Sequence, residues 1–340
     1  MTRGRALGLT LIGAAVLLAT GCQRRPSMLA PAGPQARGIE WLWWVIFWII
    51  AAVYVITMLI YARAATRRRS RTDVPEPIIK DPNDTGAKIA VSAAIAITVI
   101  TLFVVLSLSV TTGNAVANPT SKSPITIQVT GHQWWWEVIY PNSQPDQTVT
   151  TANEIHVPVG KPVVILTRSA DVIHSFWAPN INGKRDLLLG YQTAFWFQAD
   201  KPGIYHGQCA EFCGWQHAHM GFAIVAEAPD QFTKWQQQQL KPAKDPGDPT
   251  TERGRAVFLN HACVLCHTIR STDAGSRMGP DLTHLASRRM IAAETLPNTR
   301  GALAGWILDP QQQKPGNHMA PNPMSPDDMQ ALLTYLQSLE

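Results

Sequence analysis

Twelve consecutive residues decide how the fold is interpreted: Cys209-Ala-Glu-Phe-Cys213-Gly-Trp-Gln-His217-Ala-His-Met220. Two thiols, an imidazole at His217 and a thioether at Met220 lie close enough in sequence to converge from one loop. Soft thiolate and thioether ligands combined with imidazole favour copper. The stretch therefore predicts a copper site inside whatever domain presents this loop.

A further ligand has to come from another segment. His174, in Asp171-Val-Ile-His174-Ser-Phe-Trp, follows the apolar run of residues 163–167 and is the candidate. Two other interpretations stay open. One is a structural zinc site whose four ligands are Cys209, Cys213, His217 and His219. The other is a disulfide between Cys209 and Cys213, but neither alternative explains Met220 or His174.

The chain around this loop, residues 113–230, has the pattern of a β domain. Ile125, Ile127 and Val129 alternate with polar residues, and residues 155–167 contain two β-branched runs separated by a Gly and Pro turn. Short strands separated by such turns predict an all-β sandwich or a small barrel.

A second motif, Cys263-Val-Leu-Cys266-His267, lies near the C-terminus. C-x-x-C-H is the attachment signature of a c-type haem, in which two thiols add to the vinyl groups and the histidine binds the iron. A redox disulfide or half of a zinc site are the alternatives. The sixth iron ligand should be a soft donor or a second histidine. Met319, in the polar loop of residues 314–319, is the candidate, and Met324 is the alternative.

The segments that flank this motif predict a linker and a helical domain. Residues 231–250 are polar and rich in Gln and Pro, which predicts a semi-extended linker. Residues 251–340 have helical periodicity, with Thr251 as the expected cap of the first helix. Ser325 followed by Pro326 predicts the start of a final helix with one apolar face.

The N-terminus has the features of an export signal, residues 1–22. Arg3 and Arg5 precede an apolar region, residues 6–19, that is too short to span a bilayer. The small residue Gly21 directly before Cys22 predicts a lipoprotein-type signal, after whose removal Cys22 is lipidated. Ordinary cleavage near Gly21 is the alternative.

Two uncharged apolar stretches follow, at about residues 41–62 and 89–110. Each is long enough to cross about 30 Å of hydrocarbon as a helix, so residues 39–112 are predicted to form a transmembrane hairpin. Several arginines lie between positions 63 and 71. By the positive-inside rule they place the connecting loop in the cytoplasm and the rest of the chain outside.

Composition and charge exclude other classes of protein. The chain has 340 residues, of which 16% are charged, and a formal net charge of +5. Its length is enough for two or three domains. The positive excess lies beside the apolar segments, mainly in residues 1–38, so it reports membrane topology and does not indicate a groove for nucleic acid.

On these residues, the sequence resembles subunit II of haem-copper cytochrome c oxidases. The pattern C-x-E-x-C-G-x-x-H-x-x-M, with D-x-x-H-S-F upstream, matches the dinuclear copper centre of that family, CuA. Gly131-His-Gln-Trp-Trp-Trp136 matches its aromatic signature, and the two-helix hairpin matches as well. The resemblance implies a multidomain membrane protein whose β domain is cupredoxin-like.

The resemblance also implies a role for each residue of the copper motif. The CuA ligands would be His174, Cys209, the Glu211 carbonyl, Cys213, His217 and Met220. The two thiolates would bridge both coppers. The Glu211 side chain would reach a magnesium ion shared with subunit I. Trp134 would lie at the surface where a donor cytochrome delivers electrons.

The C-terminal domain resembles a class I cytochrome c fused to subunit II, as in caa(3)-type oxidases. The stretch K-P-G-N-x-M at residues 314–319 carries this match. It implies thioether bonds from Cys263 and Cys266 to haem c, with His267 and Met319 as axial ligands. The Pro280 carbonyl would accept a hydrogen bond from the His267 ring.

The resemblance implies an electron-transfer subunit of a terminal oxidase in the bacterial cell membrane, with both soluble domains on the periplasmic side. Electrons would pass from a cytochrome c donor through haem c and CuA to subunit I, where oxygen is reduced to water and protons are translocated. Subunit III and membrane lipid are further expected partners, and nucleic acid is not. The alternatives are a CuA subunit of a nitric oxide reductase and a non-enzymatic membrane protein that binds copper or senses redox state.

Two departures from the family pattern stand out. The start of the second apolar stretch, residues 86–92, has no Glu, although many members have one at the mouth of a proton channel. The family's K-x-D-x-x-P-G-R is present as residues 184–191 without its Pro and Arg. These departures put the proton-uptake role and part of the contact with subunit I in question.

Overall fold

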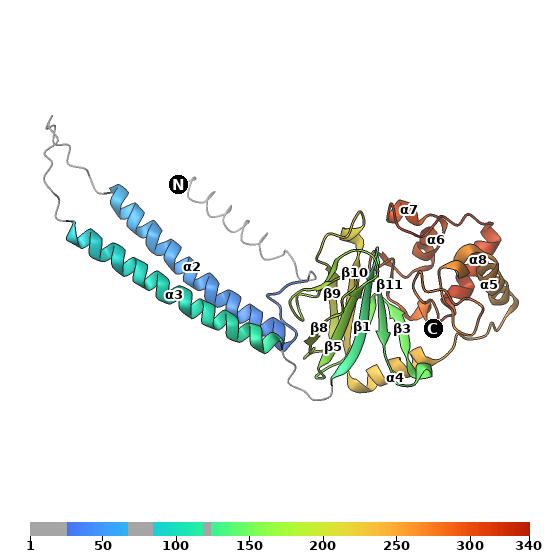
Figure 1. Cartoon of the computed structure of the whole chain (residues 1–340). Helices are drawn as coiled ribbons and strands as arrows, with labels where there is room; N and C mark the ends of the chain where they lie inside the picture. The colour runs from blue at the N-terminus through green and yellow to red at the C-terminus, as the bar shows by residue number, and fades with distance from the viewer. Residues whose placement is uncertain (1–25, 67–83, 118–123) are drawn as a thin grey trace, which may run out of the picture.

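The computed structural model describes residues 26–66, 84–117 and 124–340. It consists of a helical hairpin, a β-sandwich and a C-terminal helical domain, and Figure 1 shows the sandwich between the other two. The predicted export signal, Cys22 and most of the arginines between the two apolar stretches lie outside the described residues.

The hairpin consists of α2 (Pro34–Thr66) and α3 (Thr85–Ala117), which lie side by side and run in opposite directions (Figure 1). Each has 33 residues and is long and apolar enough to cross a membrane, and the most apolar window of each is not buried by any other part of the described chain. At about 1.5 Å per residue the helices are about 50 Å long, so they extend beyond the predicted stretches at 41–62 and 89–110 on both sides.

The start of α2 is fastened to the β-sandwich. The backbone N–H of Ala32 donates to Asn180 O at 2.7 Å, and the N–H of Asp200 donates to Ala32 O at 2.8 Å. Arg37 pairs with the Asp200 carboxylate at 2.6 Å. A Cβ on Gly33 would lie 2.2 Å from the Gln198 carbonyl oxygen, so this close approach requires glycine. The start of the hairpin therefore packs on the sandwich through backbone hydrogen bonds, an ion pair and close backbone contact.

The sandwich consists of two five-stranded sheets. The first has the order β3 (Val149–Ala152), β2 (Trp135–Tyr140), β1 (Ile125–His132), β5 (Val163–Ser169) and β8 (Thr193–Phe197). The second has the order β4 (Glu154–Pro158), β10 (Gly221–Glu227), β9 (Gly203–Cys209), β6 (His174–Trp177) and β7 (Arg185–Leu187). The pairs β1–β5 and β4–β10 are parallel, and the other strand pairs in the two sheets are antiparallel.

The inner faces of the two sheets meet in an aromatic core. Trp136, Phe176 and Phe222 are at most 1% exposed. The Phe176 and Phe222 rings stack with centroids 4.1 Å apart, and Trp136 meets both rings edge-on. Alternation of such residues with polar ones is what places one face of each strand inside. The predicted cupredoxin-like all-β fold is confirmed.

The predicted linker differs in the structure. Its first ten residues belong to α4 (Pro229–Leu240), which packs on the sandwich. Phe232 is buried, and Trp235 stacks on the His156 ring with centroids 4.2 Å apart. The Gln-rich composition concealed two aromatic side chains spaced i, i+3, which form the buried face of this helix. Only the residues between Lys241 and Asp248 remain without regular structure.

The C-terminal domain is helical apart from a two-residue strand pair. Its elements are α5 (Pro249–Asn260), η3 (Ala262–Leu265), η4 (Leu285–Ser287), β11 (Met290–Ile291), β12 (Leu296–Pro297), α6 (Arg300–Leu308), α7 (Pro310–Gln313) and α8 (Pro326–Gln337). In α8 the Ser325 hydroxyl accepts the N–H of Asp328, as predicted. In α5 the cap is Asp248 and not Thr251, because the Asp248 carboxylate accepts two N–H groups and leaves Thr251 inside the first turn.

Replacement of Phe232 by Ala tests whether α4 is part of the β domain. We expect Phe232→Ala to lower the free energy of opening of the sandwich by about 3 kcal/mol, because a buried phenyl ring is lost. Gln237, on the exposed face, is the matched control, and Gln237→Ala should change it by less than about 0.5 kcal/mol. Hydrogen exchange of sandwich amides in the intact chain measures both, and equal values for the two variants would contradict the assignment.

Candidate metal centres

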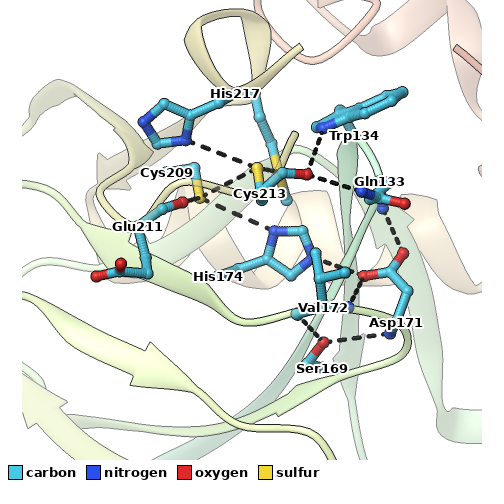
Figure 2. A network of polar contacts seen from close by, with 11 residues as sticks. Gln133, Trp134, Ser169, Asp171, Val172, His174, Cys209, Glu211, Cys213 and His217 are labelled. Atoms are coloured by element: carbon cyan, nitrogen blue, oxygen red, sulfur yellow. Dashed lines mark hydrogen bonds and ion pairs between the residues drawn. The ribbon is translucent and has the colours of Figure 1, made fainter. Parts of the chain in front are cut away.

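Four sulfur and nitrogen ligands converge at the end of the sandwich where β9 runs into the loop before β10 (Figure 2). The Sγ atoms of Cys209 and Cys213 are 3.7 Å apart. Nδ1 of His174 lies 3.9 Å from Cys209 Sγ, and Nδ1 of His217 lies 3.6 Å from Cys213 Sγ. Within the described residues, His174, Cys209 and Cys213 place their ligand atoms within 4.8 Å of one another.

Two further donors complete the cluster. Met220 Sδ lies 3.8 Å from Cys213 Sγ, and this side chain is fully buried. The Glu211 carbonyl oxygen accepts from the Cys209 thiol at 3.1 Å. Figure 2 shows the Glu211 carboxylate on the outer side, pointing away from the sulfur atoms. The two thiols therefore lie between two imidazoles, one thioether and one carbonyl oxygen.

His174 is fixed in position by Asp171. Its Nε2 lies 2.8 Å from Asp171 Oδ1, and since a carboxylate only accepts, Nε2 carries the proton and the Nδ1 lone pair faces Cys209. The same carboxylate accepts the backbone N–H groups of Gln133 and Val172, each at 2.6 Å. A Cβ on Gly131 would lie 2.8 Å from the His174 ring, so glycine makes room for it.

The other side of the cluster is held by the Cys213 carbonyl oxygen. It accepts from the Gln133 side-chain amide at 2.7 Å and from the Trp134 indole N–H at 3.0 Å. The indole lies against Gly214, where a Cβ would be 3.0 Å from the ring and where φ is +109°. A glycine is needed there for both reasons. The Trp134 indole is thus hydrogen-bonded to the backbone of Cys213, one of the two cysteines of the cluster.

The electrostatics of the cluster favour a bound cation. The hydrogen bond between the two cysteine side chains outweighs burial and lowers the pKa of Cys209 to about 3. The neighbouring thiolate then raises the pKa of Cys213 well above its usual range. Burial would lower the pKa of His174, but the bonds to Asp171 and Cys209 raise it. The pair shares a proton that a metal ion would displace.

The structure bears on both alternatives to copper. His219 is exposed, and its Nδ1 bonds to Gln216 Oε1 at 2.7 Å, outside the cluster, so the four-residue zinc set is not assembled. Cys209 and Cys213 are free thiols at 3.7 Å and not a disulfide. The cluster instead includes Met220 and His174, which neither alternative explained.

The C-terminal domain presents a second candidate site. Cys263 and Cys266 are free and half-buried in and directly after η3. The ring Nδ1 of His267 lies 2.8 Å from the Pro280 carbonyl oxygen, the contact that the resemblance implied. This bond leaves the Nε2 lone pair available to a metal. Burial lowers the pKa of His267, which favours the neutral ligand form. A Cβ on Gly279 would lie 2.7 Å from the ring.

The sixth-ligand candidates both lie beside this domain's core. Met319 and Met324 are half-buried and pack against it. Hydrogen bonds hold the backbone of the loop that carries Met319. Gln311 Nε2 donates to Asn317 O at 2.9 Å and to Met319 O at 2.8 Å. Asn317 Oδ1 accepts the Met319 N–H at 2.8 Å. Met319 therefore stays the proposed ligand, with Met324 as the alternative.

The C-terminal domain contacts the sandwich beside the sulfur cluster. Trp134, expected at an open surface, is only 7% exposed, because the 314–319 loop covers it. The His318 ring lies 5.8 Å from its indole. Arg277 pairs with Glu137 at 2.6 Å, and Gln216 donates to Pro315 O at 2.7 Å. The C-terminal domain thus occupies the surface that an external donor was expected to use.

Two family models match this chain. Residues 145–228 match cytochrome c oxidase subunit II, periplasmic domain, and residues 251–340 match cytochrome c. Cytochrome c oxidase subunit 2 of Alkalihalophilus pseudofirmus is 32% identical over 350 residues, which cover 100% of this chain and 98% of that protein. The same subunit of Bacillus sp. strain PS3 is 34% identical over 64% of this chain and 63% of its own length.

Among solved structures, the periplasmic domain of oxidase subunit II from Bradyrhizobium japonicum is 32% identical, covering 36% of this chain and 96% of that chain, with a TM-score of 0.33. Fold, site and sequence together define a copper protein of the cupredoxin type, joined to an apolar helix hairpin and a cytochrome c domain. The chain belongs to the cytochrome c oxidase subunit 2 family. It is a subunit of a haem-copper oxidase with subunit I as its partner, and the two matched families imply CuA and haem c.

Several residues that shape the two sites were not predicted from the sequence. Asp171 is part of the upstream motif, and its spacing of i, i+3 from His174 was the available signal. Gly131 and Gly279 make room for the His174 and His267 rings, and a Gly near each motif was the only hint. Gln133 lies inside the aromatic signature, but its contacts could not be predicted, because its partners lie 38 and 80 residues away.

Replacement of Asp171 by Asn tests the role of the carboxylate. We expect Asp171→Asn to weaken copper binding by about 10- to 100-fold, because the partner of a metal-ligating imidazole is altered. Chelator competition on the intact protein measures the affinity. Asp146 is exposed in η1 (Pro145–Gln147), so Asp146→Asn should leave it unchanged. Copper affinity at the wild-type level in Asp171→Asn would contradict this account.

Proposed function

We propose that this chain carries electrons from a cytochrome c donor through haem c and then CuA to the haem-copper site of subunit I. There the complete oxidase would reduce oxygen to water and translocate protons. The observation that carries the proposal is the contact of the C-terminal domain with Trp134, which joins both candidate sites in one chain. One-electron redox chemistry would be supplied by the copper pair and by haem c.

The residues of the sulfur cluster fit a dinuclear copper centre. Cys209 and Cys213 would hold the copper pair through their thiolates, with His174 and His217 as the imidazole ligands. Met220 and the Glu211 carbonyl would be the weak ligands. Four of the six donor residues are buried, and a site whose ligands are held in place changes little when its charge changes. Asp171 would hold the His174 imidazole in its ligating tautomer throughout.

The residues of the C-terminal site fit a covalently attached haem. Cys263 and Cys266 would form the thioethers, and His267 would be the axial ligand that Pro280 orients. Gly279 leaves the space beside the His267 ring. Arg288 is half-buried, and its solvent-shielded Nε has no acceptor among the described residues, which fits an anionic group of a bound cofactor. Met319 would complete the iron coordination.

The buried position of Trp134 supports haem c as the relay. Its indole is bonded to the Cys213 backbone on one side and lies against His318, the neighbour of Met319, on the other. An external donor cannot reach this indole directly, so it would have to deliver electrons to the cytochrome domain. We therefore propose Trp134 as the residue through which electrons reach the copper site, from this chain's own domain.

Other parts of the proposal follow from family membership and the sequence. The two apolar helices would anchor the chain in the bacterial cell membrane, with the sandwich and the cytochrome domain on the periplasmic side. Cys22 would carry a lipid. The outward Glu211 carboxylate would reach a magnesium ion at the border with subunit I. Subunit III and a soluble or membrane-bound cytochrome c would complete the set of partners.

Two histidines in the same loop give a matched test of the copper site. His217→Ala should lower the copper content from two atoms per chain and abolish the mixed-valence EPR signal, because one imidazole ligand is lost. His219→Ala should retain both, because His219 is exposed and bonds to Gln216. Copper analysis and EPR spectra of the intact protein measure the copper content and the mixed-valence signal of both variants. Loss of the signal in His219→Ala alone, or zinc in place of copper, would overturn the proposal.

The two methionines give a matched test of the haem site. Met319→Ala should convert low-spin haem c to a five-coordinate form, visible in the absorption spectrum, because the sixth ligand is removed. Met324→Ala should leave the haem low-spin. The haem content should remain one per chain in both variants, since the thioether bonds are unaffected. The reverse pattern would assign the ligand to Met324.

A further inference from the structure

Lys314 is a buried basic residue that the proposed function leaves unused. It opens the loop that carries Met319, a stretch whose polar composition suggests exposure to solvent, yet it is only 3% exposed. Its ammonium donates to Trp134 O at 2.9 Å and to Ala292 O at 3.2 Å. No carboxylate forms an ion pair with it anywhere in the described part of the chain.

These two carbonyls come from different domains. Trp134 lies in the turn between β1 and β2 of the sandwich, whereas Ala292 begins a turn of three non-glycine residues with φ between +54° and +62°. That turn also touches the sandwich, because the Gly221 N–H donates to Ala293 O at 3.1 Å and Glu294 pairs with His206 at 3.1 Å. Lys314 therefore connects three segments through its hydrogen bonds: the turn at Ala292, the Trp134 backbone and its own loop, residues 314–319. This loop is called the haem-binding loop, because it carries the proposed ligand Met319.

Burial of a lysine without an acidic partner costs free energy, because the ammonium loses its hydration. Burial lowers the pKa of Lys314 to about 7, while Cys213 opposes this. An apolar side chain of similar length would avoid the loss of hydration and would pack as well. What an apolar side chain cannot do is fix two carbonyl oxygens at hydrogen-bond distance, which sets the loop's position along the interface.

We propose that Lys314 is a positioning residue that fixes the haem-binding loop against Trp134 and thereby sets the rate of electron transfer from the cytochrome domain to the copper site. This inference rests on the proposed function. The rim of the interface has its own contacts, among them Arg277 with Glu137 and the Arg289 N–H with Glu154 Oε1 at 2.8 Å. Loss of the Lys314 bonds therefore leaves the domains in contact and shifts the loop locally.

The test compares Lys314→Met with the exposed control Lys244→Met in the intact oxidase. After rapid photoreduction of haem c, transfer to copper should slow at least about tenfold in Lys314→Met, because displacement of a positioned group by about 1 Å is costly. The absorption and EPR spectra and the copper and iron contents should match the wild type. Lys244→Met should match it in every respect.

A second readout does not depend on the cofactors. Amide hydrogen exchange of residues 314–319 in the metal-free chain should be about tenfold faster in Lys314→Met, because charge-assisted bonds to the loop are lost. Lys314→Gln keeps a polar head group but cannot reach both carbonyls, and it carries the same test if Lys314→Met lowers the metal content.

Wild-type transfer and exchange rates in a fully loaded Lys314 variant would overturn the inference. A loss of thermal stability or metal content, with the loaded fraction still transferring at the wild-type rate, would also overturn it, because that pattern belongs to a merely structural lysine. Absence of haem-to-copper transfer in the wild type itself would instead overturn the proposed function.

Discussion

The convergence of His174 with the sulfur atoms of the β9–β10 loop is the constraint on which the rest of the structure depends. β6 supplies the imidazole, and the loop supplies two thiols and a thioether, so the site exists only if these strands share a sheet. β6 pairs with β9, and Phe176 lies opposite Cys209 in the register. The aromatic core beneath this point fixes both strands, which couples the geometry of the ligands to the stability of the sandwich.

Residues that are not ligands themselves also fix the positions of the ligand residues. Asp171 sets the tautomer of His174, Gln133 and Trp134 bond to the Cys213 carbonyl, and Gly131 gives the imidazole its space. The C-terminal site repeats this arrangement with Pro280 and Gly279 around His267. In both sites a carbonyl or carboxylate oxygen orients an imidazole while a glycine leaves space for its ring.

The sequence was informative where the chemistry is local and silent where it is not. The copper loop, the C-x-x-C-H motif and the Ser325 cap were predictable because their partners lie within a few residues. α4 was missed because its buried face consists of two aromatic residues in a Gln-rich stretch. The burial of Lys314 and Trp134 could not be predicted, since each is covered by a domain about 180 residues away in sequence. Which surface an electron donor can reach is therefore a property of the assembled chain and not of either motif.

In the proposed function, electrons reach the copper site through this chain's own cytochrome domain. Rapid mixing of reduced cytochrome c with the oxidised, intact oxidase, followed by absorption at wavelengths specific to haem c and to CuA, tests it most directly. We expect haem c to become reduced first and CuA reduction to follow at the expense of reduced haem c. Reduction of CuA while haem c stays oxidised would contradict it.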